Sequence, residues 1–314
     1  MEASGRQTAY TDKHPAYDLV RGPSGKGLTI GYFPEIAAVA NTVDATIAYD
    51  QLHVDAFLQW IDGKTPEHSE VQAPGLTTTP ALFGGNFQAV SVGQKTKGYQ
   101  NGSLAFTPDL LKAFDFVDSS LGKVVAALKS KNIYKDTLVV IASKHGQAPI
   151  DPKLFREIDP KLVSSSTGVN VSFATTDDIA LIFLEDQSTL NTAVKNLNAA
   201  RGTLQIQDII YGDNLTDQGY GNPLKDPAVP DIIIRPQLGV IYTTSTKKIA
   251  EHGGLSDDDR KVACFVSSPK LHKASYDQQV STRQVAPTIL KALGLNPGEL
   301  EGVRIQGTQP LPEF

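Results

Sequence analysis

The sequence predicts an α/β fold in which a mostly parallel β-sheet is packed between helices. One observation is the aliphatic run Leu138 to Ile141, which ends in the polar segment Ala142 to Gln147. A buried parallel strand that ends in a loop at its carboxyl edge has this pattern. A second observation is that apolar residues recur at helical spacing from Pro108 to about Asn132, just before that strand. A helix that leads into a strand is the unit from which parallel sheets are built.

Composition and charge exclude several classes of protein. The chain has 314 residues and a formal net charge of −5. This length can bury one large core, and the negative charge offers no general attraction for nucleic acid or for an anionic membrane. No apolar run approaches the length of a membrane span. We therefore expect no nucleic-acid surface and no membrane partner, and any phosphate group must be bound at a local site.

The amino-terminal residues predict a short strand and a polar loop. Thr8 to Thr11 fit a strand, and Asp12 to Pro15 fit the loop that leaves it. Pro15 favours an extended conformation at His14. A capping or turn role is the simplest interpretation of Asp12. The alternative is that Asp12 and His14 face the same cleft as the polar residues at other strand ends.

A helix is predicted from Asn41 to Ile61, because apolar residues recur there at helical spacing. His53 lies on this helix among charged neighbours, which predicts a solvated side chain. Farther along, Pro80 to Phe83 and Phe87 to Val92 have strand patterns on either side of a short turn. Gln94 then falls in a loop at a strand end.

A second, smaller unit is predicted after Pro152, where the pattern changes for about eighty residues. The strand patterns are Val169 to Ala174, Ile179 to Leu184, Leu204 to Tyr211 and Asp231 to Arg235, and the pattern of an amphipathic helix is Thr189 to Ala200. We expect residues 153–245 to form a small α+β subdomain, inserted into a single domain that spans residues 1–314. The chain then rejoins the main sheet, with a strand from Val262 to Ser267 and a helix from Ser281 to Leu293.

Two His-Gly pairs, His145-Gly146 and His252-Gly253, follow predicted strand ends. Open α/β sheets place their chemistry at the carboxyl ends of strands, and a glycine lets the backbone turn so that the imidazole can approach an ion. One histidine at a strand end is more often a hydrogen-bonded structural residue, but two that are separated by an insertion favour a metal or catalytic site. The acidic run Asp257 to Asp259 fits a solvated helix start better than a metal cluster.

Four segments resemble one known family: residues 143–152 (SKHGQAPIDP), 250–269, 115–141 and 282–304. Together they are similar to the alkaline phosphatase superfamily, and most of all to its type I phosphodiesterase and nucleotide pyrophosphatase branch. The resemblance implies an alkaline phosphatase-like fold and a two-metal hydrolase site at the carboxyl ends of a parallel sheet. In such enzymes a Ser or Thr nucleophile attacks phosphorus, while two ions, usually zinc, stabilise the attacking and leaving oxygens.

The resemblance implies that His145 and His252 are ligands of different ions, for which imidazole is suited when the ion is zinc. Where the family usually has an Asp ligand, this chain has Lys144, whose ammonium group cannot coordinate a cation. Lys144 can instead counter the charge of a phosphate directly, which makes it a candidate catalytic residue. Near the family's Asp and His ligand pair the chain offers Asn86 and Gln94, neutral oxygen donors that suit zinc less well. We therefore expect zinc, with fewer ions than the family's two.

The resemblance also implies that a first strand ending in an Asp ligand, and then the nucleophile, precede the matched region. The sequence begins after both, so we expect a chain truncated at its amino end that lacks the family's covalent route. Two functions stay open: hydrolysis of small phosphate esters or phosphoanhydrides, and a non-catalytic relative that keeps the fold as a binding surface. Transfer or hydrolysis of a sulfate or phosphonate is a third, since a fold does not name its substrate.

Overall fold

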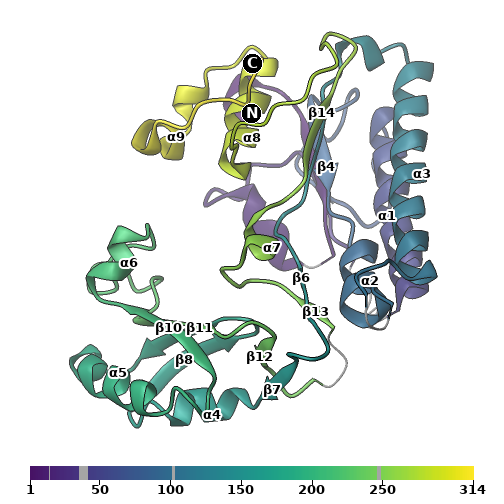
Figure 1. Ribbon diagram of the computed structural model, residues 1–314. Coiled ribbons are helices and arrows are strands. Elements are labelled where there is room, and N and C mark those ends of the chain that lie inside the picture. Colours follow the sequence, from purple (N-terminus) through teal and green to yellow (C-terminus); the bar gives the residue numbers. More distant parts are fainter. Residues whose placement is uncertain (14, 35–41, 101–102, 246–248) are drawn as a thin grey trace.

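The computed structural model describes residues 1–13, 15–34, 42–100, 103–245 and 249–314. The described residues form two bodies (Figure 1). The larger body is built from both ends of the chain, and the smaller one from residues 156–242. Short strand pairs lie where the chain passes from one body to the other.

A four-stranded sheet lies at the centre of the larger body, in the order β3-β2-β1-β4. Its strands are β1 (Thr8–Thr11), β2 (Ile30–Tyr32), β3 (Glu70–Val71) and β4 (Leu82–Gly85). β1 runs parallel to both β2 and β4, whereas β3 is antiparallel to β2. The predicted first strand and the predicted parallel pairing are confirmed for these strands. Because β1 and β4 are parallel, Asp12 and Asn86 follow them at the same edge of the sheet.

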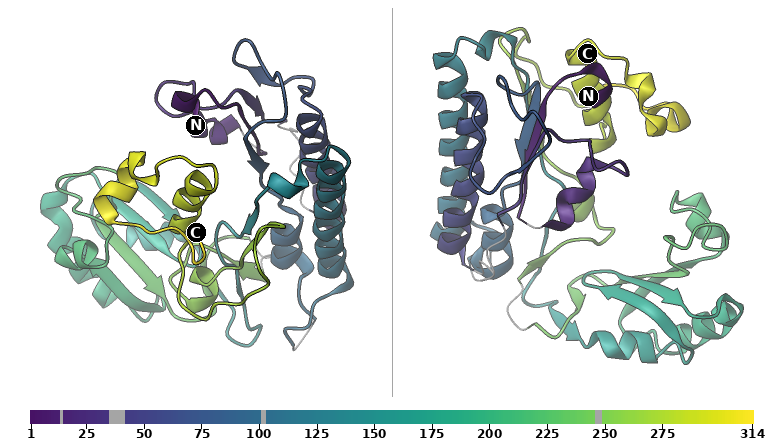
Figure 2. Two further views of the ribbon diagram at one scale, coloured as in Figure 1. Left: turned by 90° about the horizontal axis from the view of Figure 1, so that it is seen from above. Right: turned by 180° about the vertical axis from the view of Figure 1, so that it is seen from behind.

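Three helices lie on one side of this sheet (Figures 1 and 2). They are α1 (Val43–Ile61), α2 (Ala89–Lys97) and α3 (Pro108–Ser130). The hydroxyl oxygens of Thr42 and Thr107 accept backbone N–H groups and cap the first turns of α1 and α3. Phe57 and Trp60 of α1 pack with Ile30 of the sheet in one buried cluster. This apolar contact holds α1 against the sheet.

α2 corrects the sequence interpretation, because Phe87 to Val92 does not form a strand. The carboxylate of Asp50, on α1, accepts hydrogen bonds from the backbone N–H groups of Gln88 and Ala89, both at 2.8 Å. Asp50 thus caps a helix in a segment whose β-branched residues favour a strand, and this tertiary contact overrides the local propensity. Gln94 therefore lies in a helix and not in a loop at a strand end.

His53 is a second correction, because its side chain is 0% exposed. His53 lies on the same buried face of α1 as Asp50 and Phe57, at the helical spacings of three and four residues. Its Nδ1 lies 2.6 Å from the hydroxyl oxygen of Thr11, at the end of β1. The charged neighbour Asp55 is exposed instead, so the charges around His53 in the sequence lie on another face of the helix.

β5 (Val139–Ala142) pairs with β14 (Cys264–Ser267), with Val140 opposite Val266. The two strands are antiparallel, and Val139 to Ile141 are only half-buried, so the prediction of a buried parallel strand here is wrong. A run of aliphatic residues does not define the direction of the partner strand, which depends on how the chain returns to the sheet.

Two short strand pairs join the bodies. They are β6 (Ala148–Pro149) with β13 (Ala250–Glu251), which are antiparallel, and β7 (Arg156–Ile158) with β12 (Val240–Tyr242), which are parallel. The first pair lies beside the two His-Gly loops. The second pair consists of the first and the last strand of the smaller body.

The smaller body contains an antiparallel sheet in the order β10-β11-β9-β8. Its strands are β8 (Val171–Thr176), β9 (Ala180–Leu184), β10 (Ile206–Tyr211) and β11 (Ile232–Pro236), and its helices are α4 (Pro160–Ser165), α5 (Leu190–Ala199) and α6 (Asp213–Asp217). Leu197 of α5 packs on Ile182 and Ile232 of the sheet in a core of its own. The four predicted strands and the predicted helix are present, with ends shifted by a few residues.

The remaining helices are α7 (Asp257–Arg260), α8 (Val285–Ala292) and α9 (Glu301–Gln306). The 3₁₀ turns are η1 (Glu2–Ser4), η2 (Pro15–Arg21), η3 (Tyr134–Asp136), η4 (Gln187–Thr189), η5 (Thr282–Gln284) and η6 (Pro297–Glu299). Ser256 caps α7, which confirms the predicted helix start, but Asp259 is 7% exposed and not solvated. Among the described helices, none combines the length and the apolar character that a membrane crossing needs.

Candidate functional site

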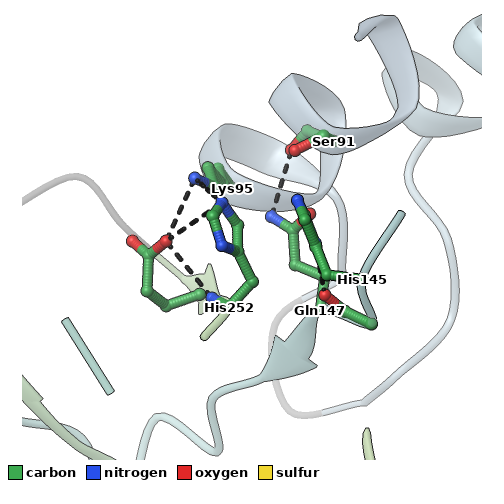
Figure 3. Close-up of polar contacts among 7 residues, drawn as sticks. Ser91, Lys95, His145, Gln147 and His252 are labelled. Carbon is green, nitrogen blue, oxygen red and sulfur yellow. Dashed lines mark hydrogen bonds and ion pairs between the residues drawn. The ribbon is translucent and has the colours of Figure 1, made fainter. Parts of the chain in front are cut away.

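Strand pairing brings the two His-Gly loops together. Ala148 of β6 lies opposite Glu251 of β13, so His145 and His252 come to the same end of one antiparallel pair. Their imidazole rings are stacked, with centroids 3.8 Å apart and an interplanar angle of 25° (Figure 3). Two side chains from distant parts of the sequence thus meet in one place.

Lys95 of α2 is a third member of this site, and sequence reasoning missed it. Its ammonium nitrogen lies 2.9 Å from Nε2 of His252 and 3.0 Å from a carboxylate oxygen of Glu251 (Figure 3). The Glu251 side chain is 1% exposed, whereas that of Lys95 is 25% exposed. The ion pair therefore holds the ammonium group beside the imidazole, while part of the Lys95 side chain stays exposed. No local pattern in the sequence indicates this contact, because it depends on α2 being a helix.

α2 anchors both histidine loops. The side-chain amide of Gln147 donates to the carbonyl oxygen of Ser91 at 3.2 Å (Figure 3). The backbone N–H of Ile249 donates to the carbonyl oxygen of Lys95 at 3.0 Å. One helix thus contacts the chain just after His145 and just before His252, which fixes the two loops relative to each other.

Burial lowers the pKa of His252 to about 4, and the nearby positive charge of Lys95 acts in the same direction. His252 therefore carries no charge at neutral pH. Its Nε2 accepts a hydrogen bond from the ammonium group of Lys95, so the ring proton is on Nδ1. Nδ1 of His252 is then a hydrogen-bond donor.

His145 is oriented by its own loop. Its Nδ1 donates to the carbonyl oxygen of Gly146 at 2.7 Å, so in the neutral ring Nε2 is an acceptor. The N–H of Gly146 donates to the carbonyl oxygen of Asp259 at 2.8 Å. A side chain at Gly146 would overlap the carbonyl oxygen of Asp258. The glycine therefore lets the backbone of α7 pack directly on the histidine loop.

Lys144 supplies a second ammonium group. It donates to the hydroxyl group of Tyr17, in η2, at 2.8 Å, and its nitrogen lies 5.1 Å from the centroid of the Tyr17 ring. The charge of Lys144 is one of those that lower the pKa of His252, after burial and Lys95. The site thus combines two imidazoles with two ammonium groups.

Two carboxylates border the loop that follows His252. A side chain on Gly254 would meet Oδ2 of Asp259 at 2.6 Å and Oδ2 of Asp178 at 3.0 Å. Burial raises the pKa of Asp178 to about 8, and the charges of Asp259 and Glu251 raise it too. Sequence reasoning did not single out Asp178, because a carboxylate between two strands fits an ordinary turn residue. In the structure Asp178, which belongs to the smaller body, lies against the loop that follows His252.

Two of the other predicted site residues, Asp12 and Gln94, have other partners. Asp12 is buried and accepts hydrogen bonds at 2.7 and 2.8 Å from residues beside it in the chain, which fits a turn role. Gln94 donates to the hydroxyl group of Tyr99 at 3.0 Å. Asn86 is half-buried directly after β4. His14 lies outside the described residues.

Residues 7–258 match the family model of type I phosphodiesterase / nucleotide pyrophosphatase. The chain belongs to this family. The predicted family resemblance is thereby confirmed, and the matched region of this type I phosphodiesterase family member includes both His145 and His252. No curated protein matches the chain.

Solved structures of ectonucleotide pyrophosphatase / phosphodiesterase 5 are similar to this family member. An inactive murine form in complex with AMP has a TM-score of 0.63 at 12% identity, over 94% of this chain and 69% of that chain. The human protein has a TM-score of 0.60 at 12% identity, over 94% and 69%. A second murine structure has a TM-score of 0.55 at 13% identity, over 85% and 62%. At such identities the likeness shows the fold, and it confirms the predicted alkaline phosphatase-like α/β class.

The donor groups of the site do not fit the zinc ions on which type I phosphodiesterases generally depend. In the part of the chain that the structure describes, no group of three or more His, Cys, Asp or Glu side chains can hold a metal ion. Protein zinc sites typically have about three or four such ligands. Here Nε2 of His252 accepts a hydrogen bond from Lys95, and Glu251 is paired with the same ammonium group. His145 and His252, which were predicted to bind zinc, are thus not joined by further ligand side chains among these residues.

Proposed function

We propose that this chain hydrolyses small phosphate esters or phosphoanhydrides at the site formed by His145 and His252. The observation that carries the proposal is the stacking of the two imidazoles, 3.8 Å apart, with Lys95 against one of them. Membership of the type I phosphodiesterase / nucleotide pyrophosphatase family supports the reaction class. The AMP in the similar murine structure supports a nucleotide phosphate as a ligand.

The groups around the imidazoles suit a phosphate. Lys95 and Lys144 supply charged N–H donors, which form stronger hydrogen bonds with phosphate oxygens than neutral donors do. Nδ1 of the uncharged His252 supplies a further donor. Donors that are fixed before the substrate arrives stabilise the charge on the phosphate oxygens without reorganisation during the reaction.

We assign proton transfer to His145. Its Nε2 accepts a proton from a water molecule as the water oxygen bonds to phosphorus, and the bond from phosphorus to the leaving oxygen breaks. The protonated His145 then returns the proton to the leaving oxygen. The hydroxyl group of Thr11 is fully buried against His53, so water is the nucleophile in this proposal.

Hydrolysis of p-nitrophenyl phosphate and of a p-nitrophenyl phosphodiester by the full chain tests the proposal. His145→Ala removes the proton acceptor, so we expect the rate to fall by about 10²-fold or more. His272→Ala removes an exposed histidine outside the site and should leave the rate unchanged. AMP binding without turnover would support the alternative of a non-catalytic relative, and turnover that His145→Ala leaves unchanged would exclude His145 as the catalytic residue.

We also propose that residues 153–245 act as an inserted subdomain of the single domain. The separate core formed by α5 and the antiparallel sheet supports this division. The turn that carries Asp178 contacts the loop after His252, so the subdomain borders the proposed site.

A further inference from the structure

Lys95 occupies the nitrogen of His252 that a metal ion would need. An imidazole nitrogen binds zinc through the same lone pair with which it accepts a hydrogen bond. In this chain Nε2 of His252 faces an ammonium nitrogen at 2.9 Å. Glu251, the carboxylate nearest in the chain, forms an ion pair with the same ammonium group at 3.0 Å. Two groups that could serve as zinc ligands are therefore both directed at Lys95.

The surroundings of Lys95 fix its charge in one position. Glu251 is 1% exposed, and a carboxylate buried to this degree needs a partner of opposite charge. The ammonium group has three N–H donors, of which Glu251 and His252 account for two. The Lys95 side chain keeps 25% of its surface exposed, and its third N–H is not used by Glu251 or His252.

Lys144 is held in a different way, which makes it an independent observation. Its ammonium group donates to the hydroxyl group of Tyr17 at 2.8 Å and lies 5.1 Å from the centroid of the same ring. It stands next to His145 in the chain. The two imidazoles are thus accompanied by two positive charges, one from α2 and one from the His145 loop.

We propose that Lys95 and Lys144 bind the phosphate group of the substrate directly, in place of the family's metal ions, so that this chain binds phosphate esters without metal. The inference rests on the proposed function, because it concerns the same site. An ammonium group serves as a point charge for phosphate oxygens, and two of them match the two charges of a phosphate monoester. The ligand class is therefore a phosphate monoester or a pyrophosphate, such as a nucleoside monophosphate.

Calorimetric titration of the full chain with AMP tests this inference in three conditions: with no addition, with EDTA and with added zinc. We expect the same affinity in all three conditions. Lys95→Met should weaken AMP binding by about tenfold or more, since a hydrogen bond to a charged group is lost. Lys95→Arg should weaken it less, because the charge remains. Lys97→Met, an exposed lysine of the same helix, is the matched control and should have no effect.

Removal of Lys95 alone takes away the ion pair of the buried Glu251 carboxylate and can unfold the chain. The double variant Lys95→Met/Glu251→Gln removes both charges, so it should fold and still bind AMP about tenfold or more weakly than the wild type. Lys144→Met provides a second test, because Lys144 has no buried carboxylate partner among the described contacts. It should also weaken AMP binding by about tenfold.

The outcomes separate this inference from the proposed function. AMP binding that requires zinc, with zinc found at one or more ions per chain by elemental analysis, would overturn the inference and leave the proposed function standing. Unchanged AMP affinity in either the Lys95→Met/Glu251→Gln or the Lys144→Met variant would also overturn it. AMP binding in no condition would also overturn the inference, whereas the absence of p-nitrophenyl ester hydrolysis would overturn the proposed function itself.

Discussion

At the scale of single residues, Gly146 is the point at which the His145 loop packs on the backbone of α7. A Cβ atom there would overlap the carbonyl oxygen of Asp258 and stand 2.6 Å from that of Asp259. Both are backbone atoms, so the loop or the helix would have to move. Gly122 offers the opposite case, because it is exposed on α3 and a Cβ atom there meets no atom within 4 Å.

Gly146→Ala should lower the free energy of unfolding by about 1–3 kcal/mol, because of the forced backbone shift. It should also reduce AMP binding, since the loop that moves carries His145 and Lys144. Gly122→Ala should raise the free energy of unfolding by about 0.5–1 kcal/mol, because alanine favours a helix more than glycine does. Urea denaturation of both variants checks these values. A Gly146→Ala variant as stable as the wild type would show that the contact with α7 is not tight.

At the scale of elements, α2 contacts both histidine loops and supplies Lys95 to the site. Asp50 of α1 caps the first turn of α2. Burial raises the pKa of Asp50 to about 7, although the N–H groups of Ala89 and Gln88 act in the opposite direction. Burial lowers the pKa of its neighbour His53 to about 4. The start of α2 therefore depends on a carboxyl group that is protonated over much of the acid range.

Asp50→Asn should change how stability depends on pH. The pKa of Asp50 is about 7 in the folded chain, above its ordinary value of 3.8, so its stabilising contribution is complete below about pH 4 and is lost as the pH rises through 7. Between about pH 5 and about pH 8, the free energy of unfolding of the wild type should fall by at most about 2–3 kcal/mol relative to that of Asp50→Asn. His53 titrates alike in both proteins and cancels. Urea denaturation at the two pH values measures the difference, which should be absent for the exposed control Asp55→Asn.

At the scale of the whole molecule, the two bodies meet where the turn between β8 and β9 contacts the His252 loop. Asp178 of that turn faces Gly254 together with Asp259 of α7. Its pKa of about 8, raised first by burial, means that it is protonated at neutral pH. Deprotonation would place another negative charge against Asp259, so the contact between the bodies should loosen in alkaline solution.

Asp178→Asn should remove this alkaline sensitivity. The pKa of Asp178 in the folded chain lies above the ordinary value of 3.8. Its contribution to the stability of the folded chain is therefore complete below about pH 4 and is lost as the pH rises through 8. Hydrogen exchange of residues 177–179 and 252–254, corrected for its intrinsic pH dependence, should increase in the wild type from about pH 7 to about pH 9. It should increase less in Asp178→Asn, whereas the exposed control Asp217→Asn should follow the wild type. Equal increases in all three proteins would exclude Asp178 as the titrating group.

Local patterns were sufficient for much of the fold and for one part of the site. His145 and His252 could be paired from the sequence because each follows a segment with a strand pattern and precedes a glycine. Lys95 could not be found in this way, because the β-branched residues before it predict a strand, and the cap that makes the segment a helix comes from Asp50 on α1. Asp178 could not be found either, since a carboxylate in a turn has no periodicity that relates it to the His252 loop.

The pairing of β6 with β13 also has a kinetic consequence. The ladder that joins Ala148 to Glu251 closes a loop of about a hundred residues, and closing a loop of that size costs entropy that local helices do not pay. The smaller body lies entirely inside this loop and has its own core, so it can collapse before the ladder forms. We therefore expect the two imidazoles to come into contact late in folding, and the ability to bind a ligand to return after most of the helical signal in a refolding experiment.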